Sequence, residues 1–133
     1  MAGCKILLVD DEPFMRSTIK AVLRLVDRFD VCEADDGDTA LVLTDSFQHD
    51  VVLCDIFMPR MGGLEYVAQL RKHPTSWMRE MPVLILTGSA DEATVRDAVR
   101  HQINGYLLKP VSSQALGARL RTILGNRRPV VPA

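Results

Sequence analysis

The sequence predicts an α/β fold: a doubly wound, five-stranded parallel sheet with five helices distributed over its two faces. Two observations carry this prediction. Short apolar runs alternate along the chain with segments of helical periodicity, five of each. The apolar runs also lack the in–out alternation of a half-exposed strand, which is typical of strands buried on both faces of a parallel sheet. Alternating strands and helices of these lengths indicate helices packed on both sides of such a sheet.

The strands are predicted where four or so apolar residues follow one another. The run at Val31–Ala34 is the least apolar, so we expect it at an edge of the sheet. In chain order the predicted strands are Ile6–Val9, Val31–Ala34, Val51–Cys54, Val83–Leu86 and Tyr106–Leu108.

Five helices are predicted between and after these strands from apolar residues spaced three or four apart. The first helix is the clearest, with apolar residues in steps of 4, 3 and 4. Ser112 and Ser113 are candidate N-caps of the last helix, and Gly125 closes it. The apolar markers of the five helices are Met15, Ile19, Val22 and Val26; Ala40, Leu43 and Phe47; Leu64, Val67, Ala68 and Leu70; Val95, Ala98 and Val99; and Leu116, Leu120, Ile123 and Leu124.

A chain of 133 residues with 47% apolar residues is sufficient for one domain with its own core. We expect the domain to span residues 4–125 and residues 126–133 to form a tail or the stub of a linker. Lys and Arg total 16 and Asp and Glu total 17, a balance that argues against direct nucleic-acid binding. No apolar run approaches the roughly 20 residues of a membrane span, so we expect no membrane insertion.

The three cysteines are widely spaced and form neither a CxxC pair nor a metal-binding pattern. Cys32 and Cys54 lie within apolar runs, which predicts buried, reduced thiols. Reduced thiols and the lack of a signal-peptide apolar region near the N-terminus favour a cytoplasmic location.

Polar residues gather where the predicted strands end. Right-handed crossovers place the C-terminal ends of parallel strands on one rim of the sheet, where ligands bind at a topological switch point. Clustered carboxylates repel one another unless a cation joins them, and Mg²⁺ is the simplest such cation because it takes carboxylates, waters and phosphate oxygens as ligands. The residues on this rim are Asp10, Asp11 and Glu12; Asp55; Thr87, Gly88 and Ser89; and Lys109 and Pro110.

This set suggests phosphoryl transfer. Asp55 would be a carboxylate nucleophile that forms an aspartyl phosphate. Mg²⁺ and Lys109 would neutralise the phosphoryl oxygens, Thr87 would donate a hydrogen bond, and Gly88 would leave space for the group. Taken singly, each residue also has an ordinary structural interpretation, such as a helix start before Pro13 or a turn residue. Their conjunction on one rim is what favours the chemistry.

Four segments of the chain resemble the receiver domains of bacterial two-component response regulators. The resemblance covers roughly residues 4–125, and the motifs follow in the family's order and spacing. The segments are Lys5-Ile6-Leu7-Leu8-Val9-Asp10-Asp11-Glu12-Pro13; Asp55-Ile56-Phe57-Met58-Pro59 followed by Gly62-Gly63; Leu86-Thr87-Gly88; and Tyr106-Leu107-Leu108-Lys109-Pro110.

The resemblance implies a flavodoxin-like fold with strand order 2-1-3-4-5. It implies that Asp55 is the phosphoacceptor, that Asp11 ligates Mg²⁺ directly and that Asp10 acts largely through water. The backbone carbonyl of Phe57 would be a further metal ligand. Thr87 and Lys109 would hold the phosphoryl oxygens, and the peptide bond between Lys109 and Pro110 would be cis.

The resemblance also implies a switch. On phosphorylation Thr87 would move toward the phosphoryl group, and Tyr106 would rotate inward into the vacated space. The surface formed by the fourth helix, the fifth strand and the fifth helix would change, a population shift biased by a local charge. An ordinary packing role is the alternative for Tyr106. Phe57 and Ser89 would flank the path of the attacking water. The Phe57 side chain has no hydrogen-bonding group and Ser89 is short, so neither orients the water well, which predicts slow self-dephosphorylation.

The implied partners are a sensor histidine kinase or a histidine phosphotransfer protein of a phosphorelay, and a downstream protein that binds the switch surface. The chain would be no enzyme beyond its own Mg²⁺-dependent phosphorylation and dephosphorylation. Two alternatives remain: a receiver module from a longer regulator or hybrid kinase, and a metal-dependent phosphatase on the same fold. The absence of a second acid–base cluster and of a substrate lid in the sequence argues against the phosphatase.

Overall fold

The computed structural model describes residues 1–88 and 91–125, without the side chain of Glu92. Within them, five parallel strands form one sheet in the order β2-β1-β3-β4-β5, as the resemblance implied. The expected edge strand, β2, does lie at an edge of the sheet. The strands are β1 (Lys5–Val9), β2 (Asp30–Ala34), β3 (Val51–Cys54), β4 (Val83–Thr87) and β5 (Gly105–Leu108).

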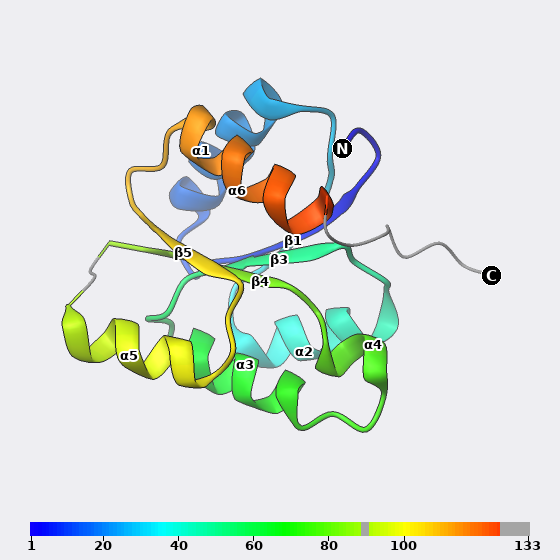
Figure 1. Ribbon diagram of the computed structural model, residues 1–133, viewed down its shortest axis with the longest axis vertical. Coiled ribbons are helices and arrows are strands. Elements are labelled where there is room, and N and C mark those ends of the chain that lie inside the picture. Colours follow the sequence, from blue (N-terminus) through cyan, green and yellow to red (C-terminus); the bar gives the residue numbers. More distant parts are fainter. Residues whose placement is uncertain (89–90, 126–133) are drawn as a thin grey trace.

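Helices cover both faces of the sheet (Figure 1). α1 and α6 lie on one face, and α2, α3, α4 and α5 lie on the other. The five predicted helices correspond to α1, α2, α3, α5 and α6. Their bounds are α1 (Pro13–Val26), α2 (Gly37–Ser46), α3 (Gly63–Arg71), α4 (Ser76–Arg79), α5 (Glu92–Arg100) and α6 (Ser113–Gly125).

The core has two layers because the side chains of each central strand alternate between the two faces. In β3, Val51 and Leu53 pack with α1 and α6, whereas Val52 and Cys54 pack with α2 and α3. All four are at most 1% exposed. Burying a side chain of this kind contributes about 1.5–3 kcal/mol, so the runs that predicted the strands are also a main source of stability.

The helix starts follow their capping residues. Pro13 occupies the first turn of α1, where its missing N–H costs no hydrogen bond. The Asp91 carboxylate caps α5 by accepting from the Thr94 N–H at 2.8 Å. At α6, the Ser112 hydroxyl accepts from the Ala115 N–H at 3.1 Å. The prediction of Ser112 as an N-cap is therefore confirmed.

Four local predictions were wrong. The segment between the third helix and the fourth strand contains a sixth helix, α4, because Met78 packs into the core at 1% exposure. Cys32 is exposed, since an edge strand has a partner on one side only. Phe47 lies at the C-cap of α2 rather than within the helix and is 58% exposed, and Val99 of α5 is 62% exposed.

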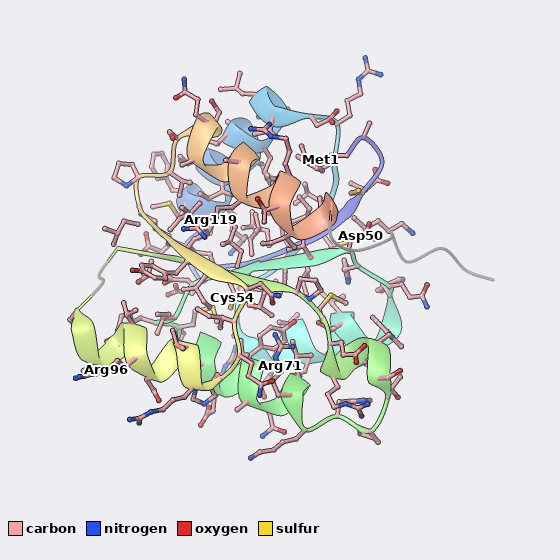
Figure 2. The ribbon with its side chains drawn as sticks, in the orientation of Figure 1. Met1, Asp50, Cys54, Arg71, Arg96 and Arg119 are labelled. Carbon is pink, nitrogen blue, oxygen red and sulfur yellow. The ribbon has the colours of Figure 1, made fainter. Side chains whose placement is uncertain are left out.

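Arg71 at the end of α3 ties together segments that are distant in sequence. Its guanidinium donates to the carbonyl oxygens of Arg79 and Met81, before β4, and of Gln102, before β5. Figure 2 places Arg71 and Cys54 on the α2–α3 side of the sheet and Arg119 on the other side. In residues 1–88 and 91–125 none of the helices has the length and apolar content that crossing a membrane requires. The predicted tail, residues 126–133, lies outside the described residues.

Candidate functional site

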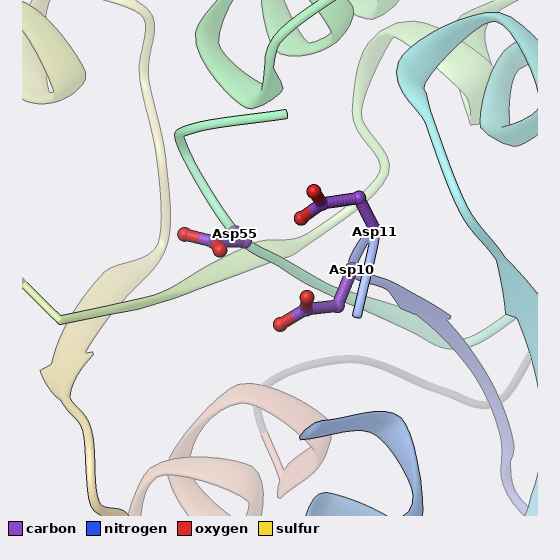
Figure 3. A group of neighbouring side chains, drawn as sticks. All are labelled: Asp10, Asp11 and Asp55. Carbon is purple, nitrogen blue, oxygen red and sulfur yellow. The ribbon is translucent and has the colours of Figure 1, made fainter. Parts of the chain in front are cut away.

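Three carboxylates meet where β1 and β3 end. Asp10 and Asp11 follow β1 and Asp55 follows β3, and these two strands are neighbours in the sheet. The Asp55 N–H donates to the Val9 carbonyl at 3.0 Å, which continues the ladder to the residue that carries the carboxylate. One oxygen from each carboxylate lies within 4.8 Å of the others. Figure 3 shows the three carboxylates facing a common space.

Lys109 supplies a positive charge to this cluster. The backbone N–H of Lys109 donates to the Thr87 carbonyl at 2.8 Å, which extends the hydrogen bonding between β4 and β5 by one residue. Its Nζ lies 2.7 Å from Oδ2 of Asp10 and 3.2 Å from Oδ2 of Asp55. Burial alone would lower the pKa of Lys109, but the hydrogen bond to Asp10 and the charge of Asp55 outweigh it and raise the pKa. The ammonium is therefore fully charged at neutral pH.

The electrostatics around Asp55 favour the arrival of a further cation. Burial raises the pKa of the Asp55 carboxyl, and the nearby Asp10 raises it further, although Lys109 opposes both. Three carboxylates facing one ammonium leave an excess of negative charge in a partly closed site. A divalent ion with oxygen ligands would remove that excess, and the donor set, all carboxylate oxygen, is the type that Mg²⁺ prefers. The residues present therefore fit a site for a divalent metal ion.

Local hydrogen bonds orient the acids. Oδ1 of Asp10 accepts from the Glu12 N–H at 2.9 Å, and its Oδ2 is held by Lys109, so both oxygens of Asp10 are engaged. Oδ1 of Asp55 accepts from the Ile56 N–H at 2.7 Å. The backbone carbonyl of Asp10 also accepts from the guanidinium of Arg16 at 2.6 Å. Sequence reasoning missed Arg16, because nothing in the spacing of α1 shows that this side chain reaches back over the rim.

The other predicted residues lie around this cluster. Thr87 ends β4 and is 2% exposed. A Cβ on Gly88 would meet nothing within 4 Å, so there is open space at that position. Phe57 is 60% exposed, and Ser89 lies outside the described residues.

Two more predicted residues lie on β5 and just beyond it. Tyr106 of β5 is 36% exposed. The peptide bond between Lys109 and Pro110 is cis, as the resemblance implied.

Gly63 lets the start of α3 lie close to the backbone of Asp55 and Ile56. A Cβ at this position would lie 2.0 Å from the carbonyl oxygen of Asp55. The Gly63 N–H donates to the Ile56 carbonyl at 2.9 Å. The start of α3 is therefore packed directly against the backbone that carries Asp55, which only glycine permits.

Comparison with known proteins identifies a family. Residues 6–121 match the family model described as "Response regulator receiver domain". The chemotaxis protein CheY of Pseudomonas aeruginosa is 35% identical over 119 residues, which cover 90% of this chain and 94% of that protein. A CheY homolog of Campylobacter jejuni is also 35% identical, with 92% and 93% covered. The transcriptional regulatory protein YdfI of Bacillus subtilis is 34% identical, and the match covers 84% of this chain but 51% of YdfI.

Solved structures agree with the sequence matches. A putative response regulator from Chloroflexus aurantiacus superposes with a TM-score of 0.85 at 28% identity, covering 92% of this chain and 98% of that one. The chemotaxis response regulator CheY4 of Vibrio cholerae superposes with a TM-score of 0.81 at 28% identity, covering 92% and 100%. With the acidic cluster in place, the chain belongs to the receiver-domain family of two-component signalling and is a CheY-like phosphoacceptor switch, not a conventional enzyme.

Proposed function

We propose that Asp55 is the residue that accepts the phosphoryl group, from a phosphohistidine donor and with Mg²⁺ present. The observation that carries this proposal is the position of the Asp55 carboxylate, which lies among the two other acids and Lys109 at the ends of the central strands. Its Oδ1 is engaged by the Ile56 N–H, and Oδ2 reaches Lys109 at 3.2 Å. A carboxylate held by one oxygen, with a cation beside the other, is well placed to attack phosphorus.

The surrounding residues take the remaining roles in phosphoryl transfer. Asp11, Asp55 and the Phe57 carbonyl would hold the magnesium directly, and Asp10 would act largely through water, as the resemblance implies. The hydrogen bonds of Asp10 to the Glu12 N–H and to Lys109 keep its carboxylate in place at the edge of this site. When bound, Mg²⁺ supplies positive charge to the transferring group. Lys109 is shared by two acids and can turn toward a phosphoryl oxygen as Asp55 becomes esterified. The Thr87 hydroxyl donates to another oxygen.

The switch surface would be formed by α5, β5 and α6, the fourth helix, fifth strand and fifth helix of the sequence prediction. Only Ala98 is buried among the described side chains of α5, so few core contacts oppose a displacement of this helix. Movement of Thr87 toward the phosphoryl group would free space for Tyr106, whose side chain is 36% exposed in this structure and could become more buried. A downstream protein would bind the altered surface.

The phosphoryl donor would be a sensor histidine kinase or a histidine phosphotransfer protein in the cytoplasm. The match covers 94% of the CheY of P. aeruginosa, which supports the first candidate, a receiver, residues 4–125, that signals by protein contact. The match to about half of YdfI supports the second candidate, a receiver module that controls a further domain.

Asp55→Asn tests the proposal. The wild-type protein, incubated with acetyl phosphate and Mg²⁺, should gain one phosphoryl group in intact-mass spectrometry, and Asp55→Asn should gain none. Asp45→Asn, which alters an exposed carboxylate on α2, should be labelled like the wild type. Undiminished labelling of Asp55→Asn would refute the assignment. Turnover of a model phosphate ester would instead favour the phosphatase alternative.

A further inference from the structure

The loop from β3 to α3, residues 56–62, carries part of the proposed magnesium site. It follows Asp55 and ends at Gly62, the N-cap of α3. The Phe57 carbonyl, a proposed metal ligand, lies on it. A backbone carbonyl has no side-chain torsions of its own, so its position depends on whatever holds the loop.

The distal part of this loop is attached to the start of α2. The guanidinium of Arg60 pairs with Oδ2 of Asp36. The Gly37 N–H donates to the Met61 carbonyl at 3.1 Å. A Cβ on Gly37 would lie 2.6 Å from Cγ of Met61, so the two segments are in close contact.

Asp36 is a rigid anchor for this attachment. Its side chain is 3% exposed, and its Oδ1 accepts from the Thr39 N–H at 2.8 Å as the N-cap of α2. The capping hydrogen bond and the pairing with Arg60 hold the pKa of Asp36 below its usual range. Its two oxygens therefore have separate tasks: one caps α2, and the other holds the loop.

Arg60 has an unusual backbone. Its φ is 64°, in the left-handed region, which is unfavourable for a residue other than glycine. Such a conformation persists where the surrounding structure determines it. The guanidinium is largely exposed, with 71% of the side chain accessible, and pairs of exposed charges contribute little stability. Here the partner, Asp36, is buried and fixed in place, so the pair determines the position of the loop more than it contributes to stability.

We propose that the pair of Arg60 and Asp36, here called the clasp, holds the β3–α3 loop in the conformation that binds the metal, so that both residues position the magnesium site without touching it. This inference rests on the proposed function through the Phe57 carbonyl. Residues that orient metal ligands typically change metal affinity 10- to 100-fold when replaced. Because one ligand among several is affected here, we expect a loss of about tenfold.

Two single variants isolate the clasp. Arg60→Asn removes the guanidinium but keeps a residue that tolerates the left-handed backbone. Asp36→Asn removes the charge but keeps an equally good N-cap for α2. Each should raise the Kd for Mg²⁺ about tenfold in calorimetric titrations of the unphosphorylated protein. Arg60→Lys should retain most of the affinity, and Arg100→Ala, an exposed arginine on α5, should retain all of it.

A double variant distinguishes a shared effect from two separate ones. Arg60→Asn combined with Asp36→Asn should lose no more affinity than either alone, because the pair is broken once. The melting temperature without metal serves as the structural readout and should change little in either single variant. Additive losses, or an unchanged Kd in both single variants, would overturn the proposal. So would a wild-type protein that binds no Mg²⁺.

The clasp and the proposed function fail separately. Absence of phosphorylation at Asp55, with Mg²⁺ affinities that follow the expected pattern, would refute the phosphoacceptor and support the clasp. Normal phosphorylation of Asp55, with Mg²⁺ affinities of the clasp variants equal to that of the wild type, would support the phosphoacceptor and refute the clasp.

Discussion

Replacing Lys109 with methionine would remove the ammonium that lies 2.7 Å from Asp10 and 3.2 Å from Asp55. Methionine is similarly long and unbranched, so the packing of the stem is largely kept. The Lys109 side chain is 12% exposed and those of the two acids 4% and 14%, so solvent screens the lost attraction only slightly. Breaking a buried pair costs about 3–5 kcal/mol. We take the lower end, about 3 kcal/mol, because Asp11 leaves one side of the cluster half exposed.

This loss converts to a melting temperature. At about 2.1 cal/mol/K per residue, 133 residues give an unfolding entropy of roughly 0.28 kcal/mol/K. The melting temperature of Lys109→Met should therefore fall by about 11 °C in metal-free buffer. Lys72→Met, at the exposed C-cap of α3, should change it by less than about 2 °C.

Magnesium should reverse part of this loss. Without the ammonium, the carboxylates have no cation beside them that competes with Mg²⁺, so the variant should bind the metal more tightly than the wild type. Binding that is tenfold tighter adds about 1.4 kcal/mol, or roughly 5 °C, to the stabilisation by saturating metal. Differential scanning calorimetry with a chelator and with Mg²⁺ measures both values. An unchanged melting temperature without metal, or equal gains from Mg²⁺ in wild type and variant, would refute the reasoning.

Three further predictions concern the backbone, the pH dependence and the phosphoryl lifetime. Gly63→Ala should lower the free energy of unfolding, measured by urea denaturation, by about 3 kcal/mol or more, because the new Cβ would lie 2.0 Å from a carbonyl oxygen. Gly88→Ala, whose Cβ would meet open space, should lower it by less than about 1 kcal/mol. Burial lowers the pKa of His49 below its value in the unfolded chain. As the pH falls below about 6.5 the unfolded state is protonated first, so the free energy of unfolding should decrease. His49→Gln should remove this contribution to the pH dependence of the free energy of unfolding. Phe57→Asn should speed loss of the phosphoryl group roughly tenfold after the donor is removed, by orienting the attacking water; unchanged decay would show that this side chain does not limit access.

Much of the fold and of the site could be predicted from the sequence because the signals are local. The apolar runs reflect burial on both faces of the sheet, and the helical periodicity reflects burial on one. Parallel strands then bring their C-terminal ends together, which is why Asp10, Asp55 and Lys109 were expected to meet and do meet. The strand order itself came from the resemblance, since local patterns do not specify which strands are neighbours.

Other features depend on the packing of residues that are distant in the chain. The exposure of Cys32 follows from the edge position of β2, and α4 forms where Met78 finds a place in the core. The contact between Arg60 and Asp36 joins residues 24 positions apart, and neither belongs to a pattern that indicates a pair. The sequence alone predicted which residues form the proposed phosphoryl site, because residue type and position at the end of a strand are local features. Only the tertiary structure decided which residues hold them in place, because those contacts exist only once the helices have packed on the sheet.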